Sequence, residues 1–220
     1  LVSPGSRCPH CEHPVRPRDN VPVLAWFLLR GRCRDCGAPI SPRYAIVEAT
    51  TGALFAVIVA ARYPDGAAIG LGLVLVTFLV PLALIDLAER RLPDRLVYPG
   101  AMLALVVGLW LDPGGEPGRL LAGAIAGGAF LLIAFAYPGG MGLGDVKLVG
   151  MLGLFLGRDV AVAIAAALLS GITLGIAIMS RKGMAEGRKT AVPFGPFLAL
   201  GGVLAILVGP DIMHAYLRGF

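Results

Sequence analysis

The chain has 220 residues, of which 57% are hydrophobic and only 15% are charged, whereas soluble domains carry about 25% charged residues. This composition excludes an ordinary soluble domain, and the chain divides better into membrane spans of about 20 residues each. A net charge of +5 would suit nucleic acid or anionic lipid, so the positions of the charges must decide between these partners.

The first segment, residues 1–43, is polar and contains all four cysteines, as Cys8-Pro9-His10-Cys11 and Cys33-Arg34-Asp35-Cys36. Two such pairs on one short segment indicate a zinc site, because four thiolates complete a tetrahedral shell. Such a metal is structural, since no position stays open for water. Two alternatives remain: disulfides, which a reducing cytoplasm disfavours, and replacement of one thiolate by His10 or His13.

The rest of the chain, residues 44–220, contains seven long apolar stretches rich in Leu, Ala, Val, Ile and Gly. They show little alternation of period two, which favours helices over barrel strands. We therefore predict an all-α polytopic membrane protein with about seven transmembrane helices, of which the fifth is short for a full span. The stretches cover residues 44–62, 67–86, 96–111, 119–137, 146–157, 160–180 and 192–213.

Small residues inside these stretches predict close helix packing. Gly123, Gly127 and Gly128 would let neighbouring helix backbones approach each other, and we favour this interpretation over contact with a ligand.

Lys and Arg residues are distributed unevenly over the loops. Fifteen of the 19 fall in residues 1–43, in the loops that follow the second and sixth stretches, or, for Lys147, at the start of the fifth stretch beside the loop that follows the fourth. The positive-inside rule places these loops in the cytoplasm and the C-terminus outside. Orientation therefore explains the basic charge, and we expect lipid and no nucleic acid as a partner.

Two carboxylates occupy corresponding depths in this topology. Asp86 ends the second stretch, and Asp145 begins the fifth after the glycine-rich run Gly139–Gly144. An aspartate inside a span costs about 2.5 to 3.5 kcal/mol and indicates function, although a helix end reduces that penalty. For either residue alone, solvation at the membrane interface remains an equal alternative.

As a pair, these carboxylates predict proteolysis. Two carboxyls in a poorly solvated site do not both ionise easily, so one acts as base toward water and the other as acid toward a peptide carbonyl. No Ser, His and Asp set competes, because His10, His13 and His214 lie far in sequence from any membrane serine.

Several motifs resemble the type IV prepilin peptidases, membrane aspartic proteases that share a GxGD element with presenilin-like proteases. Gly142-Leu143-Gly144-Asp145-Val146-Lys147 is similar to their GxGDxK motif, and the resemblance covers essentially the whole chain. The other matching segments are Cys8–Cys11, Asp19–Pro22, Arg30–Cys33 with Cys36–Gly37, Ile40–Tyr44, Val47–Glu48, Ile85–Asp86, Leu92–Asp94 and Pro193–Phe197.

This resemblance implies a multi-pass enzyme of the bacterial inner membrane, with its active site facing the cytoplasm. It would remove the basic leader of type IV prepilins and pseudopilins after a glycine, with Asp86 and Asp145 as catalytic residues and Cys8, Cys11, Cys33 and Cys36 as zinc ligands. It would then methylate the new N-terminus with S-adenosylmethionine, whose binding residues the sequence does not identify. We expect Glu48, Glu89 or Asp94 to bind the basic leader.

The chain departs from the family in one respect. Family members usually begin with a further span, so their eight spans become seven here, and Leu1 in place of Met leads us to expect a truncated N-terminus. The oligomeric state is left open. The alternative from another functional class is a zinc-stabilised membrane transporter or binding protein that carries protons on Asp86 and Asp145.

Overall fold

The computed structural model describes residues 6–137, 140–183 and 192–219, except for the side chain of residue 182. By its internal contacts the chain divides into two units, Leu1–Ala56 and Val57–Phe220, called unit 1 and unit 2 below. The division falls inside one helix, α2 (Pro42–Arg62). The expected domain boundary after residue 43 therefore stays a prediction.

Unit 1 contains little regular structure before α2. Its short helical elements are η1 (Pro17–Asp19) and α1 (Leu24–Leu28). Two isolated antiparallel bridges, Arg7 with Pro14 and Arg32 with Pro39, each close one cysteine-bearing turn. The Trp26 indole N–H donates to the Ile40 carbonyl at 3.0 Å. A side chain of α1 thus holds the segment that leads into α2.

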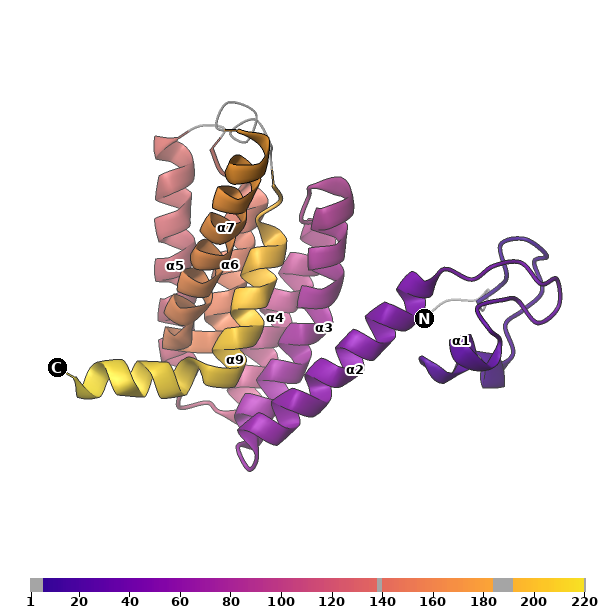
Figure 1. Cartoon of the computed structure of the whole chain (residues 1–220). Coiled ribbons are helices and arrows are strands. Elements are labelled where there is room, and N and C mark those ends of the chain that lie inside the picture. The colour runs from indigo at the N-terminus through magenta and orange to yellow at the C-terminus, as the bar shows by residue number, and fades with distance from the viewer. Residues whose placement is uncertain (1–5, 138–139, 184–191, 220) are drawn as a thin grey trace. The chain divides into compact units, whose positions relative to one another are not determined.

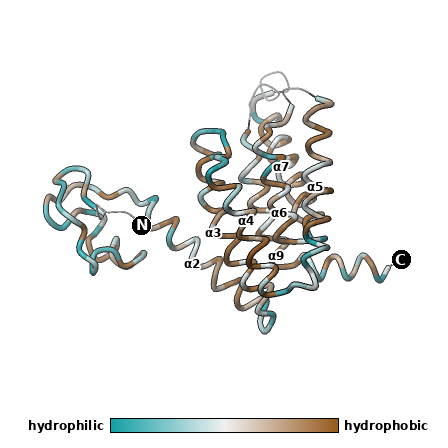
Figure 2. The backbone as a smooth tube through the Cα atoms, turned by 180° about the vertical axis from the view of Figure 1, so that it is seen from behind, coloured by the Kyte–Doolittle hydropathy of each residue, from teal (hydrophilic) through white to brown (hydrophobic). Residues whose placement is uncertain are grey.

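Unit 2 is a bundle of long helices whose hydrophobic residues run along most of their length (Figures 1 and 2). Hydrophobic side chains also cover its outside: Leu132 is 71% exposed and Leu169 is 65% exposed. A soluble bundle would present polar residues there, so this surface is suited to lipid. The helices are α3 (Gly66–Glu89), α4 (Asp94–Leu111), α5 (Glu116–Ala136), α6 (Leu143–Leu156), α7 (Val160–Lys182) and α9 (Gly195–Arg218).

Within the described residues, six segments are long and apolar enough to cross a membrane. The fifth of them, Leu143–Arg181, contains both the fifth and the sixth predicted stretches. A 3-10 turn, η2 (Gly157–Asp159), divides it into α6 and α7. The seven predicted stretches thus each have a helix in the described part of the chain, but α6 has only 14 residues and does not count as a span by itself.

Glycines bring α5 and α6 into direct backbone contact. A Cβ atom added at Gly153 would lie 2.5 Å from the Gly123 Cα atom, and one added at Gly127 would lie 3.3 Å from the Gly150 Cα atom. The predicted packing role is therefore confirmed for Gly123 and Gly127. It is wrong for Gly128, because an added Cβ there has nothing within 4 Å.

A glycine also brings α7 and α9 into close backbone contact. A Cβ atom at Gly201 would collide with the backbone carbonyl of Ala163.

Helix α9 bends in its C-terminal half (Figure 1). Pro210 within this helix accounts for the bend, since proline lacks the N–H of a helical hydrogen bond.

We expect Gly153→Ala to destabilise the protein by about 1 to 3 kcal/mol, because the new methyl group must push α5 away from α6. Thermal unfolding in detergent would measure the loss. Gly128→Ala is the matched control, since it adds the same methyl group to α5 where the space is open. Equal unfolding temperatures for the two variants would contradict the role given to the α5–α6 contact.

Candidate functional site

Asp86 lies in the last turn of α3 and is only 6% exposed. The helix ends three residues later, where Arg90 adopts a left-handed conformation and donates its N–H to the Asp86 carbonyl at 2.9 Å. The Asp86 Oδ2 atom accepts a hydrogen bond from the backbone N–H of Gly195 at 2.9 Å. A buried carboxylate thus has a backbone donor from a segment more than a hundred residues away.

Gly195 can make this contact only because it lacks a side chain. A Cβ atom there would lie 2.6 Å from the Asp86 Oδ2 atom and 3.0 Å from its Cγ atom. Gly195 is the first residue of α9, where backbone N–H groups have no partner within the helix. In the sequence, Gly195 stands between an aromatic residue and Pro196, a pattern that indicates the start of a helix. The pattern does not indicate that the Gly195 N–H faces Asp86.

Asp145 lies in the first turn of α6, after Gly142 at the N-cap. Asp145 as a whole residue is intermediate in exposure and is close enough to Asp86 for their charges to interact. The structure therefore places both aspartates at helix ends within range of each other's charge, and their role as a catalytic pair stays a prediction. The two carboxyls differ in their surroundings, because only Asp86 is fully buried.

The glycines before Asp145 have distinct surroundings. A Cβ atom at Gly144 would lie 3.0 Å from the Leu92 Cβ atom, so Gly144 lets the start of α6 pack against the turn between α3 and α4. A Cβ atom at Gly142 would lie 3.4 Å from the Asp145 Oδ2 atom. The glycine at 142 therefore keeps the space beside the carboxyl of Asp145 open.

Lys147 links the same two segments by charge. Its Nζ atom donates to both carboxylate oxygens of Asp94, at 2.8 and 2.9 Å, and lies 5.3 Å from the centre of the Tyr98 ring. Asp94 and Tyr98 belong to the first turns of α4. The ion pair and the cation–π contact fix the start of α6, and hence Asp145, against α4.

The three carboxylates expected to bind a basic leader already have partners within the chain. Asp94 pairs with Lys147, and Glu89 pairs with Arg91. Glu48 accepts the Val23 N–H at 2.7 Å. The structure therefore gives no support to a leader-binding role for them.

A second cluster lies in unit 1, where the Sγ atoms of the four cysteines are all within 4.8 Å of one another. The Sγ atoms of Cys8 and Cys36 are 3.8 Å apart and those of Cys11 and Cys33 are 4.0 Å apart, far longer than the roughly 2.05 Å of a disulfide. All four are free thiols. Among the described residues this metal-binding group contains no histidine, so it matches the four-cysteine set rather than the variant with His10 or His13.

The two halves of this cluster repeat one backbone pattern. The N–H of Cys8 donates to His13 at 3.0 Å and that of Cys33 donates to Ala38 at 2.8 Å. Each turn then closes with a hydrogen bond to the first cysteine carbonyl, from Glu12 and Gly37, and both donors have positive φ. Such paired turns place the two thiols of each pair on the same side.

The thiols do not ionise equally. Backbone N–H groups of Cys11 and His10 lower the pKa of Cys8 to about 6. For Cys11 the backbone N–H of His13 acts in the same direction, but burial and the neighbouring thiols outweigh it and raise the pKa to about 12. The Cys8 thiolate therefore forms readily, and its negative charge disfavours a second thiolate nearby. A bound divalent cation would offset this repulsion between thiolates. The donor set fits zinc in chemistry and number.

Two family models match the chain. The Bacterial Peptidase A24 N-terminal domain matches residues 1–62, and the Type IV leader peptidase family matches residues 73–179. No solved structure gives a significant match.

Relatives named "Prepilin leader peptidase/N-methyltransferase" align with almost the whole chain. The relative from Aeromonas hydrophila is 38% identical, with 100% of this chain and 77% of the relative covered. The relative from Dichelobacter nodosus is also 38% identical, over 96% of this chain and 74% of its own length. The relative from Pseudomonas aeruginosa is 36% identical, over 99% and 76%. With six apolar helices able to span a membrane in its described part, the chain is a multi-pass membrane protein, and it belongs to the type IV leader peptidase family.

Proposed function

We propose that this protein is an aspartic endopeptidase that cleaves the leader of type IV prepilins or pseudopilins, with Asp86 and Asp145 as its catalytic residues. The observation that supports this proposal is the placement of Asp86 in the last turn of α3 and of Asp145 in the first turn of α6, near enough for their charges to interact. The relatives' printed names supply the substrate class. Cleavage after glycine on the cytoplasmic face follows from the resemblance and from the distribution of Lys and Arg.

The chemistry requires the two carboxyls to carry different protonation states. Because two adjacent negative charges repel each other, one carboxyl keeps a proton while the other accepts a proton from water. The water attacks the peptide carbonyl, and the protonated carboxyl donates to the carbonyl oxygen and later to the leaving amine. The Gly195 N–H donates to the Asp86 Oδ2 atom, so it fixes the direction in which that carboxyl points.

We also propose that the cysteine cluster binds one structural zinc ion, and that the protein N-methylates the exposed N-terminus with S-adenosylmethionine. The four converging thiols support the zinc ion, and the relatives' names support the methylation. In unit 1 a cavity of about 670 Å³ has Trp26, Tyr44 and Glu48 among its lining residues. The aromatic faces of Trp26 and Tyr44 suit a cofactor with an adenine ring and a cationic sulfonium, so these residues fit this group.

The proposed pair predicts that Asp86→Asn and Asp145→Asn each reduce leader cleavage by about 10²-fold or more, because each removes the acid or the base. Purified variants in liposomes, assayed with a prepilin substrate, would measure this. Asp211→Asn is the control, because Asp211 is an exposed carboxylate in the C-terminal part of α9. Cleavage at the normal rate by either catalytic variant would refute the proposed pair and leave the proton-carrier alternative standing.

Gly195 is a positioning residue in this proposal. We expect Gly195→Ala to lower kcat by about 10-fold to 100-fold with little change in KM, because its methyl group displaces the Asp86 carboxyl while substrate binding elsewhere is unchanged. Gly175→Ala in α7 is the matched control, since an added Cβ there has nothing within 4 Å. A purely structural role would instead lower the unfolding temperature in parallel with kcat.

The zinc proposal predicts about one zinc ion per chain in wild-type protein and a large loss in Cys8→Ser. Metal analysis by mass spectrometry checks both values. We expect the variant to lose methylation while it keeps leader cleavage, since the catalytic aspartates lie in unit 2 and the cluster lies in unit 1. Wild-type protein with far less than one zinc per chain would contradict the metal assignment without affecting the protease assignment.

A further inference from the structure

Helix α1 in unit 1 presents large apolar side chains that the described part of the chain leaves uncovered. Leu24 is 61% exposed, Phe27 is 63% exposed and Leu28 is 79% exposed. Residues three and four positions apart share one face of a helix, so these three side chains form a single apolar face. The buried Ala25 and the half-buried Trp26 belong to the other side of α1.

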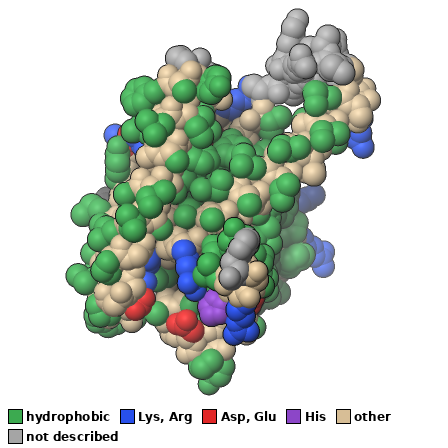
Figure 3. Space-filling view, turned by 90° about the vertical axis from the view of Figure 1, so that its left-hand side faces the viewer, with side chains coloured by type: hydrophobic (Ala, Val, Ile, Leu, Met, Phe, Trp, Pro, Cys, Tyr) green, Lys and Arg blue, Asp and Glu red, His purple; other side chains and the backbone are tan. Residues whose placement is uncertain are grey.

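In unit 2, exposure of this kind belongs to the helices that suit lipid. Hydrophobic side chains cover much of the face shown in Figure 3, and charged side chains gather near its lower end. Unit 1, by contrast, is hydrophilic over most of its length before α2 (Figure 2). The apolar face of α1 is therefore an exception within its own unit, and its exposure is typical of a surface that contacts lipid.

Helix α1 is also attached to a helix that can cross the membrane. Val23, the N-cap residue of α1, donates its N–H to the Glu48 Oε2 atom of α2 at 2.7 Å, and α2 is one of the candidate spans. Glu48 lies about 9 Å along α2 from its first residue, and residues 49–61 carry no charge. The contact therefore holds α1 at the level where α2 becomes wholly apolar, which is the depth of a membrane interface.

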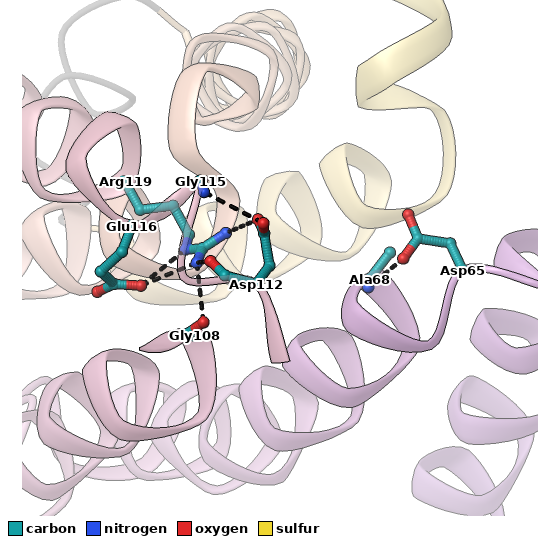
Figure 4. A network of polar contacts seen from close by, with 7 residues as sticks. All are labelled: Asp65, Ala68, Gly108, Asp112, Gly115, Glu116 and Arg119. Atoms are coloured by element: carbon teal, nitrogen blue, oxygen red, sulfur yellow. Dashed lines mark hydrogen bonds and ion pairs between the residues drawn. The ribbon is translucent and has the colours of Figure 1, made fainter. Parts of the chain in front are cut away.

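Two arginines that follow α1 have charges available for a partner. Arg30 and Arg32 are exposed, and neither forms an ion pair with any residue that the structure describes. The opposite case is Arg119 in unit 2, whose guanidinium donates to Asp112 at 2.6 Å and to Glu116 at 2.8 Å (Figure 4). Unpaired cations next to an apolar face suit a bilayer surface with anionic headgroups.

We propose that α1 inserts Leu24, Phe27 and Leu28 into the interfacial layer of the bilayer that α2 enters, with Arg30 and Arg32 beside anionic headgroups. Interfacial helices bury their apolar face about 5 to 10 Å into the boundary between headgroups and acyl chains. This contact would hold unit 1, and with it the cysteine cluster, at the membrane surface. The proposal is independent of the protease assignment, because it uses no residue of the aspartate site.

Trp26 fits this depth and provides a probe of it. Its ring is apolar and its indole N–H already donates to the Ile40 carbonyl, a combination typical of tryptophan at membrane interfaces. Its ring centroid lies 5.3 Å from that of Phe27 in an edge-to-face contact. The fluorescence of Trp26 therefore reports the depth of the apolar face of α1.

Lipid-quenched tryptophan fluorescence of the full chain tests this placement. The chain has two tryptophans, so the parent protein for the test is Trp110→Phe, in which Trp26 is the only fluorophore of this kind. In nanodiscs of phosphatidylglycerol and phosphatidylcholine, we expect lipid brominated near the glycerol to quench Trp26 more strongly than lipid brominated near the chain end.

The double substitution Leu24→Gln and Leu28→Gln removes two apolar side chains and leaves Phe27 in contact with Trp26. This loss lowers the insertion equilibrium by a factor on the order of 10², so we expect most of the quenching to disappear. Leu132→Gln is the matched control, since it makes the same change at an equally exposed position of α5. Its quenching should equal that of the parent.

The arginines are tested by lipid charge. Arg30→Gln combined with Arg32→Gln should reduce quenching in discs that contain phosphatidylglycerol and leave it unchanged in discs of phosphatidylcholine alone, because only the first surface is anionic. An equal reduction in both discs would overturn the assignment of these arginines to anionic lipid.

Unquenched Trp26 in the parent, or unchanged quenching in the leucine double variant, would overturn the proposal and assign the apolar face to a protein partner. Unfolding temperatures of all variants would show whether the fold is retained. The parent carries no substitution in unit 1, so its quenching decides the question even where a variant unfolds.

Discussion

In an apolar helix bundle, backbone groups without a partner lie mainly at helix ends, because most groups within a helix are bonded to their own helix. The candidate catalytic site obeys this constraint throughout. Asp86 is in the last turn of α3, Asp145 is in the first turn of α6, and Gly195 begins α9. Three helix ends thus supply two carboxyls and one free N–H donor, and the N–H meets the carboxyl that is buried.

Helix ends are useful only if the helices hold them in place, and this protein fixes its helices with glycine. Gly153 and Gly123 bring the backbones of α5 and α6 together, and Gly201 does so for α7 and α9. Side-chain packing between leucines would leave more adjustable distances, whereas backbone contact leaves almost none. The starts of α6 and α9 are therefore positioned by contacts far along each helix, and Lys147 adds an ion pair close to Asp145.

The sequence predicted much of this arrangement because its signals were local. Four cysteines in two short turns and two aspartates at the ends of apolar stretches are visible as patterns. The structure places the four thiols together and puts both aspartates at helix ends near enough for their charges to interact. The contact of Gly195 with Asp86 was not predictable in this way. It joins the start of α9 to the end of α3, segments far apart in the chain, and no spacing rule reports such a contact. The division of Leu143–Arg181 was anticipated, since Gly157-Arg158-Asp159 interrupts its apolar pattern.

The two ends of unit 2 differ in how far the chain supplies hydrogen-bond donors to its buried carboxylates. At one end Asp86 has a donor from the chain itself, and this contact fixes the carboxyl for chemistry. At the other end Arg119 donates to Asp112 and Glu116, while one oxygen of Glu116 and one of Asp159 have no hydrogen-bond partner among the described residues. The chain therefore completes the hydrogen bonding of its buried carboxylate at the candidate catalytic end and leaves it incomplete at the other, so the fixed carboxyl direction that chemistry needs is found only at the end with Asp86.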